Sequence, residues 1–524
     1  MRSTFHSLET AKRSLFTQQT ALSTVGHNIA NANTEGYSRQ TVNMTASRPM
    51  EAVGLMRSNA PGQLGTGVEY SSINRIREGF LDAQYRNENK TQGNWSIQLD
   101  TLEKLETIMN EPSDAGIRTV VDNFYKAWHD LSESPEDITA RKLVKETAQS
   151  LTDAFNQASK QLSDLSMDIN ENIQVKVSQV NTTISTITNL NSQIVRIEGL
   201  GDNANDLRDQ RDLLVDQLSK VVNITAVDGP QGYQVSMGTV NLVNGNAVTP
   251  PVTVDSLEDA YSSGTLNGGE VYGMIVSREV FVKDYTKQLD QLANAMANGE
   301  ITVKLPSGSV IPEGTTLGTT TYTGTVASRT LASDLTVKVA GLNGLHKLGY
   351  TLVDGAVTAG DNFFVSKDGG PITASSFQVN NKILGDASYI ASSMRTYMDG
   401  TTEKVVKGNK DLALGIAQLV DTKVNFASIS NGELTLNGTV NDFFRSIVGQ
   451  LGVQTEAAKR QTNNSKMVVD QVDSRRQSVS GVSIDEEMTS MIKYQHAYNA
   501  AARVMTSVDE MLDKIINGMG VVGR

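Results

Sequence analysis

Hydrophobic residues recur every seven positions at both ends of the chain. The N-terminal stripe comprises Leu8, Leu15, Leu22 and Ile29, with Ala11, Gln18, Val25 and Ala32 three residues behind each of them. The C-terminal stripe comprises Ile484, Met491, Tyr498, Met505 and Leu512, and Tyr494, Ala501, Val508 and Ile515 follow the last four by three residues. Alternating spacings of three and four place such residues on one side of an α-helix. The pattern predicts two terminal helices that share one periodicity.

Each stripe is narrow, and the rest of each predicted helix is polar. Such a helix is neither a buried core helix nor stable alone in water. We therefore expect the two helices to pair, with each other or with neighbouring copies of the chain. The simpler alternative is a pair of ordinary amphipathic helices docked on a globular body. The predicted pairing seam sets Leu8, Leu15, Leu22, Val25 and Ile29 against Ile484, Met491, Tyr498, Met505 and Leu512.

Helical periodicity continues inward from both ends. Apolar residues at spacings of three and four predict helices over 78–110, 117–131, 140–198, 204–220 and from 439 onward. In the fourth helix, Asn205 or Asp206 is a plausible cap, and Arg208 stands four residues before Asp212. Leu207, Leu214 and Leu218 define its expected apolar face.

The centre of the chain has a different character. Residues 221–275 and 299–399 are rich in Thr, Val and Gly and contain short strand-like runs, among them VNLVNGNAV with its Asn-Gly hairpin signal. A helix at about 277–298 separates the two stretches, and the many threonines of 301–337 suggest an insertion. The expected fold class is multidomain α+β, with helices leading into and out of a β-rich head.

Composition excludes several classes of function. The 524 residues carry a formal net charge of −12, and no basic run of five or more could neutralise a row of phosphates, so a nucleic-acid role is not expected. No stretch approaches 18 consecutive apolar residues, and the polar start MRSTFHSLETAKRSLF does not suit a signal peptide. The absence of cysteine excludes disulfides and thiolate chemistry and hints weakly at export.

Motifs for catalysis or metal binding are missing or better explained as structure. The five histidines are scattered, and neither a phosphate-binding loop nor a nucleophile elbow is present. The acidic run GLGDNANDLRDQRD resembles a calcium loop, but Leu207 occupies the position that requires glycine, so a helix start is the better interpretation. Asp485, Glu486 and Glu487 are interpreted as the acidic first turn of the C-terminal helix. We expect no enzyme, cofactor or metal.

The polar stretch GHNIANANTEGYSRQ at 26–40 follows the N-terminal stripe directly. It could be a polar active site, but Ser38 has no base in view and His27 shows no partner of its own. Asparagine and glycine favour the turns in which helices stop. We therefore predict a hinge at which the terminal helix ends and the chain turns into the next domain. The hinge residues are Asn28, Asn31, Asn33, Gly36, Tyr37, Ser38 and Arg39.

Three separated motifs resemble one protein family. NIANANTEGYSRQ at 28–40 and SGVSIDEEMTSMIKYQHAYNAAARVMTSVDEMLDKII near the C-terminus resemble the signatures of bacterial flagellar rod, hook and hook-associated proteins. NDLRDQRDLLVDQLS resembles a segment found in the members that join hook to filament. The resemblance covers about 1–225 and 400–524. Leu345–His346 and Gly349 resemble a segment that normally follows the 277–298 helix directly, which again marks 299–340 as an insertion.

The resemblance implies a layout and a function. Residues 1–35 with 480–524 would form a terminal coiled coil lining the inner tube of the flagellum, 36–222 with 400–479 a helical body, and 223–399 a β-rich outer head. The chain would be a structural junction between hook and filament that assembles through its terminal helices. Alternatives are another axial protein, of the rod or hook, or a surface-displayed enzyme or adhesin carried by the head.

The resemblance also implies partners and a location. They are copies of the chain itself, the hook protein, a second junction protein, the flagellar export apparatus, and a chaperone that binds the C-terminal helix. Members of the family leave the cell unfolded through the export channel without a cleaved signal. We therefore expect an extracellular protein of the flagellum, with no nucleic acid bound and no membrane insertion.

Overall fold

The computed structural model describes residues 5–49, 65–109, 116–229, 232–353, 357–426 and 437–518. The chain forms two compact units. Unit 1 comprises residues 1–95, 173–273 and 461–524, and unit 2 comprises 96–172 and 274–460. Three long helices contribute residues to both units: α2 (Gly79–Met109), α4 (Ile138–Glu198) and α13 (Val440–Ser480).

The longest helix shows why these segments are helical. Buried residues of α4 recur at alternating spacings of four and three, as in Val144, Ala148, Leu151, Phe155 and Ala158. This places an unbroken apolar stripe along one side of the helix, while the other sides are polar. The predictions of helices over 78–110, 140–198 and from 439 are confirmed.

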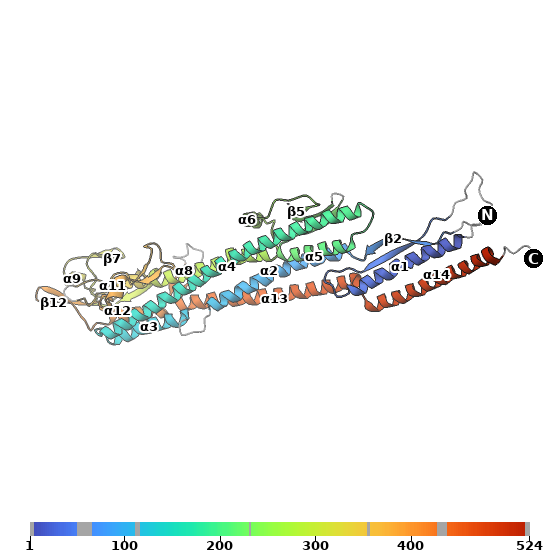
Figure 1. Cartoon of the computed structure of the whole chain (residues 1–524). Helices are drawn as coiled ribbons and strands as arrows, with labels where there is room; N and C mark the ends of the chain where they lie inside the picture. Colours follow the sequence, from blue (N-terminus) through green and yellow to red (C-terminus); the bar gives the residue numbers. More distant parts are fainter. Residues whose placement is uncertain are drawn as a thin grey trace, which may run out of the picture. The chain divides into compact units, whose positions relative to one another are not determined.

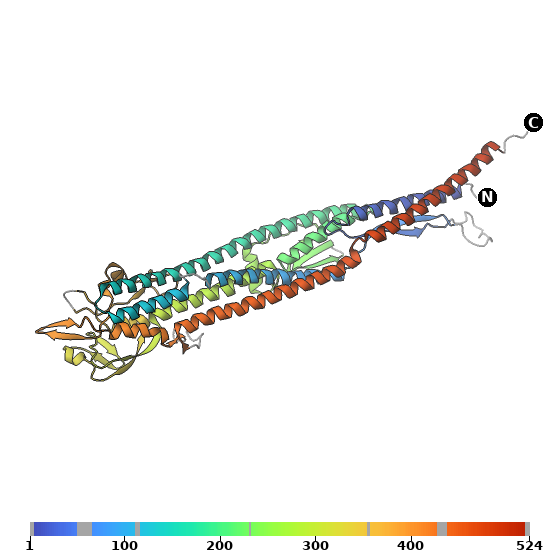
Figure 2. The same ribbon diagram turned by 90° about the horizontal axis from the view of Figure 1, so that it is seen from below.

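Unit 1 contains both terminal helices. Apart from its parts of the three long helices, its elements are α1 (His6–Ala30), β1 (Gln40–Ala46), β2 (Val68–Arg75), α5 (Asn205–Val221), β3 (Thr225–Gly229), β4 (Gly232–Met237), β5 (Val240–Asn244), α6 (Val254–Ser262), α7 (Glu270–Val276, whose last three residues belong to unit 2) and α14 (Ile484–Gly518). Figures 1 and 2 both show α1 and α14 side by side. The antiparallel pair β1–β2 packs on α1, with Gln40 opposite Arg75 and a bulge between Asn43 and Met44. This pair was missed because its exposed strands are mostly polar.

Unit 2 is built from its parts of the long helices, two helices of intermediate length, α3 (Ile117–Glu133) and α8 (Lys283–Asn298), and a set of short elements. The short elements are a π-helical turn (Ser277–Val282), β6 (Glu300–Leu305), β7 (Thr315–Leu317), β8 (Thr320–Tyr322), α9 (Val326–Arg329), β9 (Leu335–Ala340), α10 (Gly341–His346), β10 (Phe364–Ser366), β11 (Phe377–Val379), α11 (Asn381–Gly385), β12 (Thr396–Asp399), β13 (Thr402–Val405), α12 (Asp411–Ala417), β14 (Val424–Asn425) and β15 (Asn437–Gly438), with 3₁₀ turns at Ala387–Tyr389 and Gln418–Asp421. The helix expected at 277–298 in fact starts with α7 and passes through the π-helical turn.

The strands form small sheets rather than one large one. Over the described ranges there are seven sheets, one of three strands (β3–β4–β5) and six of two. Strands lie at most of the expected places, and the Asn-Gly signal marks a tight turn closed by an isolated antiparallel bridge between Asn244 and Ala247, without a second strand. β5 itself pairs with β4 and ends at Asn244, and Gly245 turns the chain with a φ of 59°.

The threonine-rich segment between α8 and α10 starts and ends at one place. Its first and last strands, β6 and β9, pair antiparallel along their whole length, with Glu300 opposite Ala340. The Asn343 side-chain amide donates a hydrogen bond to Asn298 Oδ1 at 2.9 Å, joining the flanking helices. Residues 299–340 therefore leave and rejoin the rest of unit 2 at adjacent points.

The core of unit 2 is aromatic. Phe124 and Trp128 of α3 pack against Phe363 and Phe364, and all four are fully buried. His346 completes this cluster, edge-on to Trp128 with 6.4 Å between ring centroids. Its Nδ1–H donates to the Asp361 carbonyl at 2.6 Å, and its Nε2 accepts from the Ala391 N–H at 2.9 Å. Because both ring nitrogens are committed, the imidazole is held in its neutral form.

This histidine makes the stability of unit 2 depend on pH. Burial lowers the pKa of His346 to about 4. Its contribution is complete above the ordinary histidine pKa of about 6.5 and is lost as pH falls toward 4, at about 1.4 kcal/mol per pH unit. We expect urea denaturation followed by Trp128 fluorescence to show this loss. A His346→Gln variant should be less stable at neutral pH and lack this part of the pH dependence. Parallel curves for the two proteins between pH 6.5 and 4 would contradict the assignment.

Candidate assembly site

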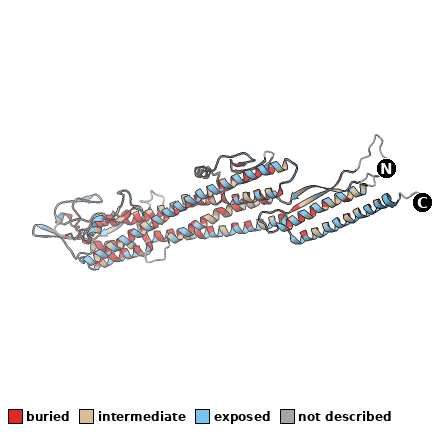
Figure 3. Ribbon diagram, in the orientation of Figure 1, coloured by how far each residue is buried: buried red, intermediate tan, exposed pale blue. Residues whose placement is uncertain are grey.

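The two ends of the chain meet in unit 1. α1 packs along α14 and also contacts β1 and β2. The buried positions of α1 are mostly small: Ala11, Thr17, Ala21, Thr24, Val25 and Asn28. In α14 only Glu487, Ala501 and Val508 are buried. Small residues at these positions allow a close approach of the helices, and most of the α14 surface remains free (Figure 3).

The predicted seam residues differ in burial. Val25 is buried, and partly buried are Leu8, Leu15, Leu22, Ile29, Met491, Met505 and Leu512. Ile484 and Tyr498 are exposed, at 52% and 36%. Ala501 and Val508, the residues three positions behind two members of the C-terminal stripe, are more deeply buried than the stripe itself. The pairing of the ten residues across one seam stays a prediction.

Asn28 lies at the centre of the hinge. It is 1% exposed, and every hydrogen-bonding group of its side chain is used. Its Nδ2 donates to the Gln40 carbonyl at 2.9 Å and to Glu487 Oε2 at 3.0 Å. Its Oδ1 accepts from Tyr37 Oη–H at 2.8 Å and from the Gln40 N–H at 3.0 Å. One buried amide thus joins the end of α1, the returning chain and the start of α14.

Arg39 makes a second connection to α14. Its Nε donates to Glu487 Oε1 at 2.7 Å, and its Nη1 donates to Glu486 Oε2 at 2.7 Å. The Arg39 N–H also donates to the Ser480 carbonyl at the end of α13, at 2.8 Å. Although burial opposes it, the two glutamates raise the pKa of Arg39, which stays charged. The acidic first turn expected for α14 is confirmed, but two of its members also bind the hinge.

The other hinge residues build the turn itself. α1 ends at Ala30, and the Asn31 N–H and side-chain amide both donate to the His27 carbonyl. Asn33 is exposed. Tyr37 is half-buried, and its pKa is raised by burial and then by the nearby carboxylates Asp206, Asp209 and Glu487.

Ser38 and His27 do not form a catalytic pair. The Ser38 N–H donates to Asp209 Oδ2 at 2.8 Å, and its hydroxyl accepts from Arg77 Nη1 at 3.3 Å. His27 Nε2 lies 3.2 Å from Asp206 Oδ1, so the expectation that His27 has no partner is wrong. The ring of Tyr37 lies edge-on to His27, with 5.5 Å between the ring centroids. These contacts are those of a structural turn, and the role of this turn as a hinge stays a prediction.

Gly36 is the hinge position where glycine is required. Its φ is +79°, and an added Cβ would lie 3.0 Å from Leu213 Cβ. We expect Gly36→Val to cost about 1–3 kcal/mol of local strain and to misdirect α1. Joining of filament to hook, seen by electron microscopy, should be harmed more than thermal stability of the chain. Gly26→Ala is the matched control, because its Cβ meets nothing within 4 Å. Equal damage to assembly and stability in Gly36→Val would argue against a hinge role.

A buried cluster of arginines and aspartates contacts the predicted hinge at Ser38. Its members are Arg75, Arg77, Arg86, Arg211, Arg476, Asp82, Asp209, Asp212 and Asp216, with side chains no more than 13% exposed. Nitrogen–oxygen distances include 2.6 Å for Arg75–Asp209, 2.7 Å for Arg86–Asp216 and 2.5 Å for Arg476–Asp216. Five arginines surround four aspartates.

The cluster shifts the titration of its carboxylates in opposite directions. Burial would raise the pKa of Asp212, but the guanidinium groups around it, Arg77 foremost, hold that pKa below its usual range. At Asp209 burial is the larger effect and raises the pKa, against the opposing influence of Arg75. The ionised form of Asp212 is therefore stabilised by several arginines together.

Several expectations for α5 are wrong. The helix begins at Asn205 after Ala204, and no side chain caps it. Arg208 pairs with Glu198 at 2.6 Å and Asp228 at 3.0 Å, not with Asp212. Of the expected apolar face only Leu218 is buried. The spacing of Asp209, Asp212 and Asp216 puts all three on one helical face, and that pattern was the available signal for a charged buried face.

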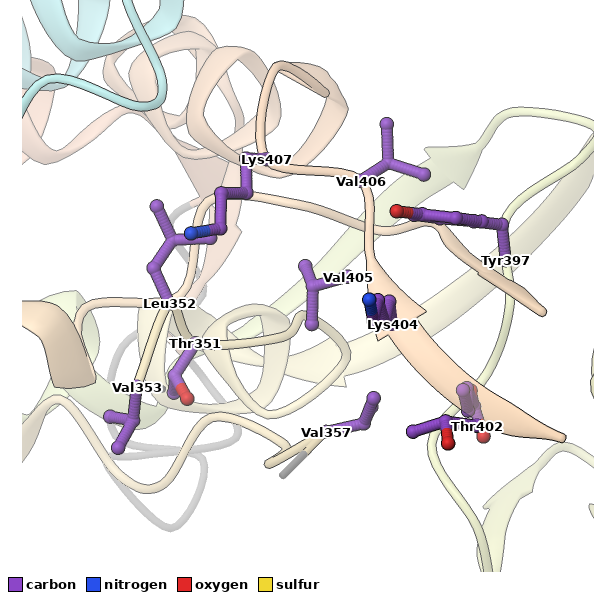
Figure 4. A pocket seen from close by; sticks show the side chains of 11 residues that line it. Thr351, Leu352, Val353, Val357, Tyr397, Thr402, Lys404, Val405, Val406 and Lys407 are labelled. Carbon is purple, nitrogen blue, oxygen red and sulfur yellow. The ribbon is translucent and has the colours of Figure 1, made fainter. Parts of the chain in front are cut away.

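A cavity of about 570 Å³ lies elsewhere, in unit 2 beside β13 (Figure 4). Val353, Val357 and Val405 contribute apolar lining. Glu403 accepts hydrogen bonds from Arg329 and Thr396 at 2.6 Å, and Lys404 contacts Asp399 at 2.5 Å. The charged groups are engaged in structural contacts, and the lining residues include no histidine.

In the part of the chain that the structure describes, no three histidine, aspartate or glutamate side chains gather in a way that could bind a metal ion. No helix there combines the length and the apolar character needed to cross a membrane.

Three family models match separate parts of the chain. Residues 8–37 match "Flagella basal body rod protein", and 474–518 match "Flagellar basal body rod FlgEFG protein C-terminal". Residues 102–300 match "Flagellar hook-associated protein FlgK helical domain". The two terminal matches cover α1 with the hinge and the end of α13 with α14. The class defined by this paired site is that of the bacterial flagellar axial proteins.

Comparison with individual relatives narrows the class. The chain is 33% identical to flagellar hook-associated protein 1 of Bacillus subtilis, with 100% of both chains covered. It is 26% identical to the proteins of the same name from Salmonella typhimurium, covering 95% of this chain and 97% of the relative, and from Escherichia coli, covering 97% and 99%. The chain belongs to the flagellar hook-associated protein 1 family, whose members are structural proteins of the hook–filament junction.

The fold is also similar to a solved structure. The flagellar hook junction protein FlgK from Burkholderia pseudomallei aligns with a TM-score of 0.50 at 17% identity, covering 75% of this chain and 100% of that one. The shared features are a mixed, mostly helical fold with small sheets and long terminal helices.

Proposed function

We propose that the chain takes its place at the hook tip by self-assembly through α1 and α14. The observation that carries this proposal is the apolar surface that α14 leaves exposed: Ile484, Met488, Ile492, Tyr498, Val504, Met511, Ile515 and Ile516. Phe5, directly before α1, and Phe16 of α1 are also exposed, at 61% and 58%. Exposed apolar surface of this extent on one helix pair marks a protein–protein interface.

The proposed arrangement of subunits is heterologous, with the apolar surface of one subunit against a different surface of its neighbour. Repeated contacts of that kind build a helical lattice when the rotation between subunits does not close, and a ring when it does. The terminal segments, 1–35 with 480–524, would form the coiled-coil inner tube. Residues 36–222 with 400–479 would form the helical body, and 223–399, with the inserted 299–340, the outer head.

The proposed partners follow from this position. They are further copies of the chain, the hook protein below, the second junction protein above, the export apparatus, and a chaperone that covers the C-terminal helix before assembly. The exposed apolar residues of α14 are a surface that such a chaperone would shield. The proposed location is the extracellular part of the flagellum.

Immuno-electron microscopy tests the proposal. Antibody against the chain is expected to label a narrow band at the boundary of hook and filament in intact flagella. Label along the whole hook, in the rod or over the cell surface would contradict it. The matched control is a strain that lacks the protein, in which the band is absent.

A further inference from the structure

The two ends of the chain hold each other through one buried carboxylate. Glu487 is 2% exposed, and each of its oxygens has a partner from the N-terminal segment. Oε1 accepts from Arg39 Nε at 2.7 Å and Oε2 accepts from Asn28 Nδ2 at 3.0 Å. If either donor were displaced, an oxygen of a buried charge would lose its partner, which costs more than an ordinary exposed contact.

The N-terminal segment also depends on α14 for its hydrogen-bond partners. Arg39 is held on α14 by Glu486 and Glu487 and at the end of α13 by the Ser480 carbonyl. Without α14 in place, the buried amide of Asn28 loses one acceptor and the Arg39 guanidinium loses both carboxylates. The N-terminal segment between these two residues is therefore ordered by the C-terminal helix, as well as the reverse.

The same contacts fix the alignment of the helices. Stripes that repeat every seven residues can be matched again after a shift of seven residues, about 10 Å along the axis. Apolar side chains tolerate such a shift, whereas the hydrogen bonds of Asn28 and Arg39 to Glu487 exist in one alignment only. A buried polar contact is an established means of fixing register between paired helices.

We propose that Asn28, Arg39 and Glu487 form a clamp that makes the docking of α1 and α14 one cooperative event in a single register. The clamp itself is a property of the chain. Its consequence for assembly rests on the proposed function: a subunit with one displaced end offers no complete pair of helices to its neighbour.

Hydrogen exchange on the full chain, followed by mass spectrometry, tests the clamp. Asn28→Ala and Glu487→Gln are each expected to lower protection in both α1 and the first turns of α14, by about 10- to 100-fold. The double variant is expected to lose less than the sum of the two single losses, because the Asn28–Glu487 contact is common to both. Ser23→Ala and Asp485→Asn, exposed positions on the same two helices, are the controls and should leave protection unchanged.

Three results would overturn the clamp. They are loss confined to the mutated helix, additive losses in the double variant, and absence of protection in both helices of the unmodified chain. The role in assembly is read separately, by microscopy of cells that carry each variant. Coupled exchange together with normal junctions would retain the clamp and reject its consequence for assembly.

Discussion

Asp216→Asn is expected to lower the free energy of unfolding of unit 1 by about 3–5 kcal/mol, the usual cost of removing one partner from a buried ion pair. Asp216 receives hydrogen bonds from Arg86 at 2.7 Å and Arg476 at 2.5 Å. Asparagine keeps the size of the side chain but removes its charge, so the cluster would hold five arginines and three aspartates. The excess buried charge is the physical reason for the loss.

Urea denaturation measures this effect. Trp95 in unit 1 and Trp128 in unit 2 are the two tryptophans of the chain. A Trp128→Phe background therefore leaves Trp95 as the single fluorescent reporter. Asp202→Asn is the control, because Asp202 lies just before α5 and is exposed. A loss below about 1 kcal/mol in Asp216→Asn, the range of an exposed ion pair, would show that the cluster contributes little to stability.

Leu22→Asp is expected to abolish joining of filament to hook while unit 2 stays folded. Leu22 lies beside the buried residues Ala21 and Val25, on the helix that packs against α14. A carboxylate there would have to be desolvated for the helices to pack, at a cost of several kcal/mol. Cells that carry the variant should release filament protein and swim poorly, and electron microscopy should show hooks without filaments.

The neighbouring Ser23→Asp provides the control for charge on α1. Ser23 is exposed, so the same added charge remains in water. Detection of the Leu22→Asp protein in the culture medium would separate failed assembly from failed export. Normal motility and intact junctions with this variant would remove Leu22 from the predicted seam.

Local periodicity was sufficient to predict the long helices. In α4 the apolar spacing of three and four residues recurs along the whole helix, so the prediction of a helix does not depend on any single residue. The same holds for α2 and α13. The end of α1 and the turn after it were predictable for a similar reason, since Asn31 and Gly36 have backbone preferences of their own. Periodicity did not show which charged side chains form ion pairs with one another. Arg208 stands one turn from Asp212 in sequence, but Glu198 and Asp228 are its partners in space.

The clamp and the cluster were missed because both join distant segments. Glu487 and Asn28 are 459 positions apart, and each has an adequate local explanation as a helix start or a helix end. The strands β1 and β2 were missed because most of their residues are polar, although Val42, Met44 and Ala46 alternate with polar residues in β1. The β-rich centre was predicted as one head, whereas strands of three to six residues there form separate small sheets.

The paired base of residues 299–340 has a consequence for how this protein can change. Because β6 and β9 bring Glu300 opposite Ala340, the segment between them closes on itself whatever its length. Closure entropy rises only slowly with loop length, by about 0.6 kcal/mol for each doubling. Lineages can therefore lengthen, shorten or exchange this segment without moving α8 or α10. The same two strands are a suitable graft point for displaying a foreign peptide, while the terminal helices remain as they are.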